Sequence, residues 1–489
     1  MYIYYKTIIN KLRGLNIMNK RIKQLLKSLK ELYLIEVVEK VALKTKFMKR
    51  KSKITPEIFL SLCLFGGEDL CRSSLLQLRS RLEAREDITI SPQALDQRFN
   101  EKSVEFLKSI FNEMFKKQNT ILRDEEALLK SHFKAIKVVD STTIILPEHL
   151  KTTYRGSGGS ASDAAVKVQL QLDLLTGSFI NCDISEAVSN DADYLPVLEK
   201  SIEEKELHLK DLGYFNSDHL HIVDNSGAYY ISKLKSTSAI YIKNENPEMN
   251  DKGKIKKSSI YKKVDIQEIA APLTEGETIE ILDIYIGKDK FKTKLILTKL
   301  TQECKINREK KFLKDVKKGK KEFSDKNIFW NSINIYITNI PNTILSKDQI
   351  HDIYSLRWQV ELMFKIWKSI FKIHDVKKVK LERFQCFLYA RLISLLLTSS
   401  IVSTGKKIPY EERKMEISPM KSFGIVKEFF SGFREKIFQG EIVLIRFLSK
   451  IIESIMKYGV KSKKKGKKTS FEIIESVKIS EYEVESLVV

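Results

Sequence analysis

The chain has 489 residues, and its 43% hydrophobic and 30% charged content is typical of a soluble globular protein with roughly three domains of about 150 residues. Lys and Arg number 86 against 63 Asp and Glu, which gives a formal net charge of +23. This excess favours a polyanionic partner such as nucleic acid, although an AT-rich genome that favours Lys and Ile codons would also produce it.

Features that would place the chain in other classes are weak. The five cysteines are odd in number and scattered without a CxxC pair, which argues against a disulfide framework or a zinc knuckle and for reduced thiols inside the cell. Residues 1–12 contain no small-residue cleavage site, so no signal peptide is expected. The most apolar stretch, residues 386–403, contains Arg391 and barely reaches spanning length, so it predicts a buried helix rather than a membrane span.

The first 130 residues are predicted to be helical because apolar residues recur in them at helical spacing. Ser91-Pro92 is typical of an N-cap followed by Pro at the first helical position, which predicts a short helix over residues 92–99. Its side chains Gln93, Gln97 and Arg98 suit base edges and phosphates. A helix-turn-helix is compatible with this pattern, and an ordinary helical domain is nearly as good an interpretation.

From residue 135 onward, short runs rich in Val, Ile and Thr alternate with helical runs. Strands are predicted over residues 135–146, 166–174, 179–184, 207–212 and 228–234, and helices over residues 191–206 and 217–225. Thr176-Gly177 predicts a hairpin between the second and third strands. This order of strands and helices is the order of a ribonuclease-H-like core.

The chain then departs from that simple core. Residues 236–300 contain further predicted strands, over 278–286 and 291–297, and look like an all-β insertion. A highly charged helical run is predicted over residues 303–326, and one more strand over 334–338. A long helical region follows from residue 346 to about residue 458.

The helix predicted after Ser346 carries four polar residues on one face. Tyr354, Arg357, Glu361 and Lys368 fall within a sector of about 60°, at roughly 100° per residue. A separate apolar stripe is predicted to pack on the core, and it consists of Leu356, Val360, Met363, Trp367 and Ile370. On an arbitrary helix, the polar row would be a solvated face with Arg357 and Glu361 paired at i,i+4.

The spacing of this row is more specific than a solvated face requires. The row has the spacing of the YREK signature, in which Tyr, Arg, Glu and Lys are separated by two, three and six residues. The chain resembles the insertion-sequence DDE transposases that carry this signature. The resemblance implies two further carboxylates. Asp140 on the first predicted strand and Asp211 after the fourth supply them, the latter in an Asp-x-Gly-Tyr-Phe segment typical of the family. The resemblance extends from about Ala135 to Leu397.

The resemblance implies that Asp140, Asp211 and Glu361 form a catalytic triad that holds two divalent ions, Mg²⁺ or Mn²⁺. Such ions take carboxylate oxygens and can assist attack at phosphorus. Taken singly, Asp140 could cap a turn and Asp211 could form one. Asp183 is the most plausible substitute because it also lies on a predicted core strand. The other acidic residues nearby are Asp173, Asp191 and Asp218.

The resemblance also implies that Tyr354, Arg357 and Lys368 position the transposon end by contacting its phosphates. Family members tend to place a tryptophan near the strand before the signature helix, where it stacks on a flipped base. The nearest candidate here is Trp330, whereas the strand position itself holds Asn334 or Ile335. The base-stacking role of Trp330 is therefore open, with a core role as the alternative.

The implied activity is metal-dependent cleavage at transposon ends and strand transfer into target DNA, by a cut-and-paste route through a hairpin. The expected partners are double-stranded DNA, as inverted repeats and as target, and a second copy of the chain, with no membrane. A bacterial cytoplasmic, nucleoid-associated location follows. The alternatives are a transposase-derived DNA-binding protein without catalysis and a ribonuclease-H-like nuclease that cuts without joining.

The predicted fold class is α/β, with a ribonuclease-H-like catalytic core interrupted by an all-β insertion and flanked by helical N-terminal and C-terminal regions. The predicted domains are a helical DNA-binding region (1–130), the first part of the core (131–235), a mostly β insertion with the charged helical run (236–326), the rest of the core with the Glu-bearing helix (327–405) and a helical C-terminal region assigned to dimerisation (406–489).

Overall fold

The computed structural model describes residues 22–23, 25–26, 35–48, 52–65, 70–124, 132–158, 162–319, 322–437, 439–462 and 466–477. The expectation about residues 1–12 lies outside these ranges. The chain forms two compact units, each assembled from several segments. Unit 1 comprises Met1–Leu128, Ser141–Ser189 and Val360–Thr469, and unit 2 comprises Leu129–Asp140, Asn190–Gln359 and Ser470–Val489.

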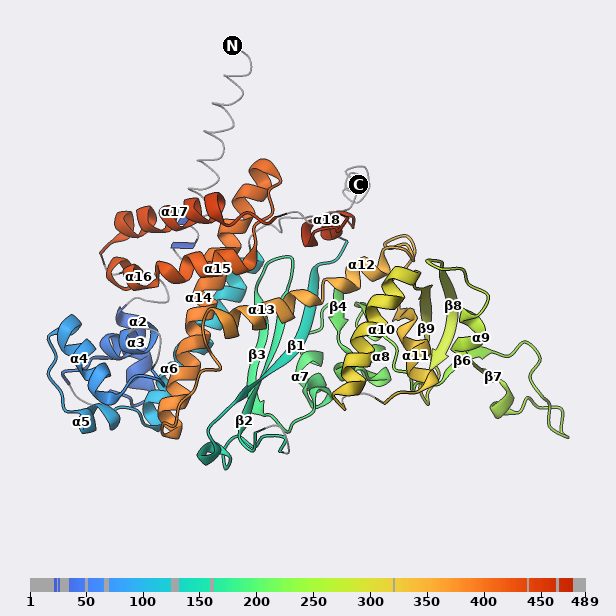
Figure 1. The fold of residues 1–489 in the computed structure, drawn as a ribbon, viewed down its shortest axis with the longest axis horizontal. Coiled ribbons are helices and arrows are strands. Elements are labelled where there is room, and N and C mark those ends of the chain that lie inside the picture. The colour runs from blue at the N-terminus through green and yellow to red at the C-terminus, as the bar shows by residue number, and fades with distance from the viewer. Residues whose placement is uncertain are drawn as a thin grey trace, which may run out of the picture. The chain divides into compact units, whose positions relative to one another are not determined.

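Unit 1 is mostly helical, and its central element is the long helix α14, Leu381–Arg413 (Figure 1). Helices α3, α6, α15 and α17 all pack on α14. Gln118 of α6 anchors one of these contacts by donating to the Leu396 carbonyl of α14 at 3.2 Å. The other helices of the unit are α2 (Ile35–Lys44), α3 (Pro56–Phe65), α4 (Leu75–Glu86), α5 (Pro92–Asp96), α6 (Glu101–Asp124), α15 (Pro419–Glu428), α16 (Phe430–Ile437) and α17 (Glu441–Tyr458).

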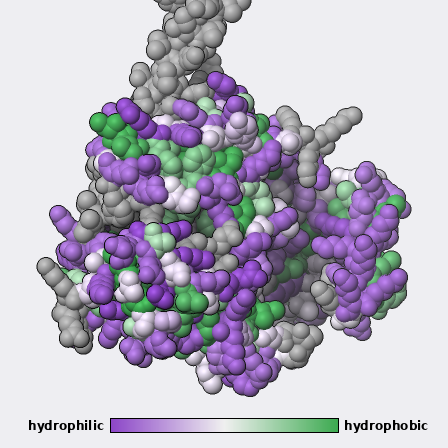
Figure 2. All heavy atoms as spheres, turned by 60° about the vertical axis from the view of Figure 1, so that its left-hand side comes forward, coloured by the Kyte–Doolittle hydropathy of each residue, from purple (hydrophilic) through white to green (hydrophobic). Residues whose placement is uncertain are grey.

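The apolar stretch at residues 386–403 lies inside α14, as a core helix. Among the described residues, one segment, Leu381–Tyr410, is long and apolar enough to cross a membrane, but 89% of its most apolar window is buried inside the protein. Polar side chains within it make hydrogen bonds inside the protein: Arg383 donates to the Leu70 carbonyl and Ser394 to the Ala390 carbonyl. In Figure 2 the visible face is mostly hydrophilic, with hydrophobic side chains in separate groups.

The predicted cap at Ser91-Pro92 is confirmed. The Ser91 side chain accepts from the Ala94 amide, and Pro92 opens helix α5. The helix is shorter than predicted, because it ends at Asp96 instead of residue 99. Gln97 is the C-cap, and its amide donates to the Gln93 carbonyl at 3.0 Å, so these two residues lie one turn apart, whereas Arg98 follows the helix.

The predicted hairpin is also confirmed in unit 1. Strand β2 (Ala165–Asp173) pairs antiparallel with β3 (Phe179–Glu186). Asp173 ends β2 and accepts hydrogen bonds from the Leu175 and Thr176 amides at 3.1 and 3.3 Å. Its carboxylate thereby holds the turn, which is a structural role. Within this unit the strand order is β3-β2-β1, where β1 (Ala135–Ile145) contributes residues 141–145.

Unit 2 contains a large mixed sheet with the order β1-β4-β5-β10-β9-β8-β6-β7, to which β1 contributes residues 135–140. The pairs β1–β4 and β4–β5 are parallel, and the remaining pairs for which a register is defined are antiparallel. The strands that follow β1 are β4 (Glu206–Lys210), β5 (Tyr229–Lys233), β6 (Ile240–Lys243), β7 (Tyr261–Val264), β8 (Thr278–Ile286), β9 (Phe291–Lys299) and β10 (Ile333–Thr338).

The helices of unit 2 are short, apart from one, and several are capped by local side chains. Asn216 caps α8 by accepting from the Asp218 and His219 amides, and α8 spans the predicted residues 217–225. The full set is α7 (Leu195–Glu199), α8 (Ser217–Asn225), α9 (Ile266–Ala270), α10 (Gln302–Lys317), α11 (Asp325–Asn331), α12 (Ile350–Ser355) and α18 (Ser470–Glu475), with α13 (Trp358–Ser369) beginning in this unit.

Two sequence predictions about unit 2 were wrong. The helix predicted over residues 191–206 ends at Glu199, and the chain then runs through Lys205, whose φ is +62°, into β4. The insertion is not all-β, since Asp265 caps the helix α9 by accepting from the Gln267 amide. Its strands β8 and β9 also continue the same sheet as β10, so they extend the core sheet instead of forming a separate one.

The single helix predicted after Ser346 is broken into two. Helix α12 ends at Ser355 and α13 begins at Trp358. Between them, the amides of Leu356 and Arg357 donate to carbonyls three residues earlier, at 3.1 Å each. This tightened turn changes the rotation per residue, so the four signature residues do not form one row on a continuous helix. The apolar stripe is nevertheless buried at Leu356, Val360, Met363 and Trp367.

Candidate active site

Asp140 and Asp211 lie at matching positions of two parallel strands in unit 2. The register of β1 and β4 pairs Val139 with Lys210, and each aspartate is the next residue along its chain. Asp140 lies within β1, and Asp211 follows β4 with an extended backbone, φ −76° and ψ 166°. Parallel pairing therefore places the two aspartates side by side on adjacent strands, at the point where β4 ends and β1 continues.

Arg357 lies between the two aspartates. Its Nη1 is 3.7 Å from Asp140 Oδ2, and its Nε is 3.9 Å from Asp211 Oδ1. The Arg357 side chain is 16% exposed, against 22% for Asp140 and 49% for Asp211. One guanidinium thus balances two carboxylates that remain open to solvent on one side, and a planar cation at this position is also suited to bind phosphate oxygens.

Tyr354 is buried beneath this group. Its hydroxyl donates to the Lys210 carbonyl at 3.1 Å, and its ring lies 5.0 Å from that of Tyr336. Burial raises the pKa of the Tyr354 hydroxyl, so it stays protonated and keeps donating. The hydrogen bond fixes the end of β4, one residue before Asp211. The structure thereby places Tyr354 behind Asp211 and not at the surface.

The glycine of the Asp-x-Gly-Tyr-Phe segment has a packing reason. Leu212–Tyr214 form a single 3₁₀ turn after Asp211. A Cβ on Gly213 would lie 3.1 Å from Oδ2 and 3.6 Å from Cβ of Asp191, which is tighter than an ordinary van der Waals contact. A larger residue would push Asp191 or the turn away, and the turn carries Asp211 at its start.

Glu361 and Lys368 belong to unit 1, on helix α13. Lys368 donates from Nζ to the Thr143 carbonyl of β1 at 3.1 Å, three residues after Asp140 in the chain. Burial lowers the pKa of the Lys368 ammonium. Glu361 is partly exposed, on the side of α13 away from Met363 and Trp367. Across the described ranges, no group of three or more His, Cys, Asp and Glu side chains is placed to hold a metal ion.

The alternative carboxylates have settings of their own. Asp173 holds the β2–β3 turn, Asp191 packs against Gly213, and Asp218 lies in the first turn of α8. Asp183 is exposed on β3 in unit 1.

Trp330 lies on α11 and is partly buried. It packs against the hydrophobic core of unit 2, and its ring meets that of Phe329 at 6.3 Å, edge to face. The strand position discussed above is filled by Asn334, which is buried and accepts a hydrogen bond from Arg308. These contacts give Trp330 a structural role in the described conformation.

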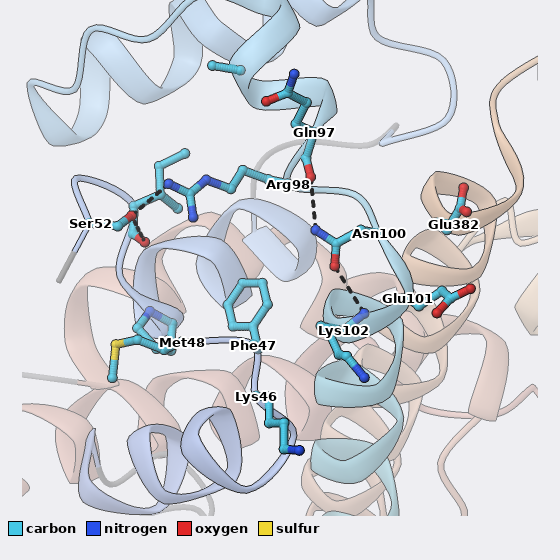
Figure 3. Close-up of a pocket in the computed structure, with 13 residues that line it drawn as sticks. Lys46, Phe47, Met48, Ser52, Gln97, Arg98, Asn100, Glu101, Lys102 and Glu382 are labelled. Atoms are coloured by element: carbon cyan, nitrogen blue, oxygen red, sulfur yellow. Dashed lines mark hydrogen bonds between the residues drawn. The ribbon is translucent and has the colours of Figure 1, made fainter. Parts of the chain in front are cut away.

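Two of the three N-terminal candidates, Gln97 and Arg98, line a cavity in unit 1. Figure 3 shows Arg98 extending to Ser52, to which its Nη2 donates at 2.9 Å. Gln97 also lines this cavity, together with the cationic residues Lys46 and Lys102, whereas Gln93 does not. The acidic residues Glu101 and Glu382 line it as well, so its charge is mixed.

Sequence reasoning missed a buried layer of charged and titratable residues next to Asp211. Lys137 of β1 and Glu206, His208 and Lys210 of β4 are all at most 5% exposed. Lys137 Nζ lies 2.6 Å from Glu206 Oε2, and Lys210 contacts His219, which pairs with Glu199 at 2.7 Å. The signal was available, because polar residues at every second position of a strand share one face.

Burial makes this layer sensitive to acid. It lowers the pKa of His208 from 6.5 to about 4, so between these pH values the unfolded chain binds a proton that the folded chain does not. Stability from this residue is therefore present above pH 6.5 and lost as the pH falls, by about 3 kcal/mol at most. Thermal unfolding across pH 4–7 should show a steeper acid loss for wild type than for His208→Leu. A variant of the exposed His221 should match wild type, and parallel profiles for His208→Leu and wild type would contradict the assignment.

The comparison with known proteins bears directly on this arrangement. A family model described as "Transposase DDE domain" matches residues 131–397. A transposase for insertion sequence element IS1151 from Clostridium perfringens is 46% identical over 468 residues, which cover 96% of this chain and 99% of that protein. The chain belongs to the insertion-sequence DDE transposases.

Other relatives of this transposase are similar over most of its length. A transposase for insertion sequence element IS231B from Bacillus thuringiensis subsp. berliner is 36% identical, covering 89% of this chain and 92% of that protein. A solved piggyBac transposase synaptic complex with hairpin DNA aligns with a TM-score of 0.42 and 11% identity, over 91% of this chain and 88% of that one. The DDE transposases are divalent-metal-dependent enzymes that cleave nucleic acid and transfer strands.

Proposed function

We propose that this transposase moves its element by a cut-and-paste route and that Asp140, Asp211 and Glu361 are its catalytic carboxylates. The observation that carries the proposal is the placement of Asp140 and Asp211 at matching register positions of the parallel strands β1 and β4, with Arg357 within 4 Å of both. Glu361 is assigned by its spacing from Arg357 in the sequence.

The donor set fits hard divalent cations. Asp140, Asp211 and Glu361 are all partly exposed carboxylates, and carboxylate oxygens together with water and substrate oxygens are the ligands that Mg²⁺ or Mn²⁺ takes. Two such ions, when bound, would activate the attacking oxygen and stabilise the leaving one. The residues that would hold them are Asp140, Asp211 and Glu361.

We further propose that the core is ribonuclease-H-like. The order β3-β2-β1 in unit 1 and β1-β4-β5 in unit 2, with β4 and β5 parallel to β1, supports this assignment. We also propose the domain division predicted from the sequence, including a DNA-binding role for residues 1–130 and dimerisation through residues 406–489.

The chain's own residues would act on the DNA in named ways. Arg357 would bind oxygens of the phosphate under attack through its guanidinium, and Lys368 would bind the adjacent backbone. Tyr354 would act through the Lys210 carbonyl by holding the strand end that carries Asp211. The proposed contacts to the transposon ends are made by Gln93, Gln97, Arg98 and Trp330. The observation that supports Gln97 and Arg98 is that both line the N-terminal cavity.

The proposed sequence of steps uses one site, because each step is an in-line attack at phosphorus. Water cuts one strand at the element end and leaves a 3′-hydroxyl. That hydroxyl attacks the opposite strand, which closes a hairpin and releases the flanking DNA. Water opens the hairpin, and the same 3′-hydroxyl then attacks target DNA. Two ends must be joined, so a homodimer on DNA is proposed, acting at the nucleoid in the bacterial cytoplasm.

The hairpin route is tested with labelled duplexes that carry the inverted repeat and are already nicked at the element end. With Mg²⁺, a normal 3′-hydroxyl at the nick should give a hairpin on a denaturing gel, followed by joining to target DNA. The matched duplex with a 3′-deoxy end should give neither product, although an intact duplex should still be nicked. Release of flanking DNA from the 3′-deoxy duplex would show that the second strand is cut by water and would overturn the hairpin step.

A further inference from the structure

A second cavity lies in unit 2, close in the chain to Asp211. It has a volume of ≈ 490 Å³ and three walls. The residues that line it are Phe215 and Ser217, then Ser238, Ala239 and Tyr241 at the start of β6, and Ile286, Gly287, Lys288 and Lys290 where β8 turns into β9. Its size falls within the range of small-ligand sites, about 300–1,000 Å³. The sequence did not single it out, because its walls come from three separate segments.

One wall of this cavity is cationic. Lys290 Nζ lies 3.4 Å from the centre of the Tyr241 ring and 3.5 Å from the Gly287 carbonyl oxygen, and the exposed Lys288 lies beside it. Lys235 does not line the cavity, but its Nζ lies 5.5 Å from the centre of the ring of Phe215, which does. None of the described residues that line the cavity is acidic. The wall is therefore suited to an anion.

The other walls combine flat apolar surface with hydroxyl groups. Phe215, Ala239 and Ile286 supply the apolar part, and Ser217 and Ser238 supply groups that can donate and accept hydrogen bonds. Gly287 permits this arrangement, because its φ is +74° and a Cβ there would lie 3.0 Å from Ser217 Oγ. An anion site next to an aromatic wall with hydroxyls has the chemistry of a nucleotide site.

The cavity is also tied to the proposed active site through the backbone. Asp211 and Phe215 are the two ends of one 3₁₀ turn, in which the Tyr214 amide donates to the Asp211 carbonyl at 3.0 Å and the Phe215 amide to the Leu212 carbonyl at 3.2 Å. Phe215 cannot shift without disturbing Asp211. A DNA strand whose phosphate is cut beside Asp211 would therefore have its neighbouring nucleotides within reach of this cavity.

We propose that the cavity binds one nucleotide of the DNA strand that is cleaved at the element end. Lys288 and Lys290 contact its phosphate, and its base lies against Phe215 with its edge toward Ser217 and Ser238. The proposal rests on the proposed function of this transposase, since it takes the cleaved strand to lie at Asp211. It assigns a positioning role to the segment between β8 and β9.

The test uses the full chain and inverted-repeat duplexes with 2-aminopurine placed at one position at a time around the cleaved end, in Ca²⁺ so that no cutting occurs. The probe is quenched by base stacking in a duplex, so wild type should raise its fluorescence at one position, where the nucleotide leaves the stack for the cavity. Ala239→Phe, which fills the cavity, should abolish that increase. Lys290→Ala should weaken end binding and lower the slope of log affinity against log salt by about one. Lys292→Ala is the matched control, an exposed lysine on β9 that pairs with Asp283 outside the cavity.

The outcomes separate this proposal from the proposed function. If wild type cuts and joins normally but raises the fluorescence at no position, or if both cavity variants behave like Lys292→Ala, the nucleotide site is wrong and the transposition route stands. If wild type raises the fluorescence as expected but does not release ends with Mg²⁺ or Mn²⁺, the route fails and the cavity stands as a nucleotide site for the element end. Lys290 is partly exposed, so its variant keeps the test valid if Ala239→Phe does not fold.

Discussion

Asp211→Asn should lower the rate of cleavage at the element end by about 10³-fold or more. An amide offers one weaker oxygen where a carboxylate offers two charged ones, so a divalent ion would lose several kcal/mol of binding and transition-state stabilisation. Asp140→Asn and Glu361→Gln should have effects of the same size. The measurement is single-turnover cleavage of a labelled inverted-repeat duplex in Mg²⁺, with binding of the same duplex measured in parallel.

Asp183→Asn is the matched control for this prediction. Asp183 is an exposed aspartate on β3 of unit 1 and was the best sequence alternative to Asp211. Its variant should cut at the wild-type rate, and all four variants should bind the repeat within a few fold of wild type. Normal cleavage by Asp211→Asn, or loss of cleavage by Asp183→Asn, would remove Asp211 from the triad.

Lys137→Met should destabilise the protein by roughly 3–5 kcal/mol. Lys137 and Glu206 form an ion pair at 2.6 Å with side chains 0% and 2% exposed, and removing one partner leaves a buried charge without compensation. The double variant Lys137→Met/Glu206→Leu removes both charges and should recover most of the loss. The measurement is the denaturant midpoint of unfolding at pH 7.

An exposed ion pair supplies the control for the buried one. Lys134 pairs with Glu203 in unit 2, but these side chains are 61% and 40% exposed, so Lys134→Met should change stability little. If the double variant of the buried pair were as unstable as Lys137→Met, packing and not the unpaired charge would explain the loss. A neutral effect of Lys137→Met would mean that Glu206 takes up a proton at little cost.

Much of the fold could be predicted, because local patterns decide local elements. The strand β1, the hairpin of β2 and β3, and the helix α8 follow from alternation, a Thr-Gly turn and an N-cap that act within a few residues. The errors occur where neighbours in sequence are not the deciding contacts. The break between α12 and α13 comes in the segment that carries Arg357 to Asp140 and Asp211, and no helical periodicity could reveal it.

Some residues of the candidate site could also be predicted from local sequence, and others could not. Asp140, Asp211 and Arg357 could be named from the sequence because they stand in short motifs. The two aspartates meet because the parallel register of β1 and β4 places them side by side. The role of Tyr354 could not be predicted, since its hydroxyl bonds to a backbone carbonyl 144 residues earlier in the chain. The Lys137–Glu206 pair was missed for a similar reason, because it forms only when β1 and β4 pair.

The sequence by itself determined the family, the identity of the candidate carboxylates and the order of strands and helices in the core, because spacing, alternation and capping act over a few residues. Only the tertiary structure decided which groups meet: the guanidinium of Arg357 between two aspartates, the buried charged layer beside Asp211 and the cationic cavity beyond Phe215. The physical reason is that burial, charge pairing and cavities arise from segments brought together by strand register, and no single stretch of chain encodes them.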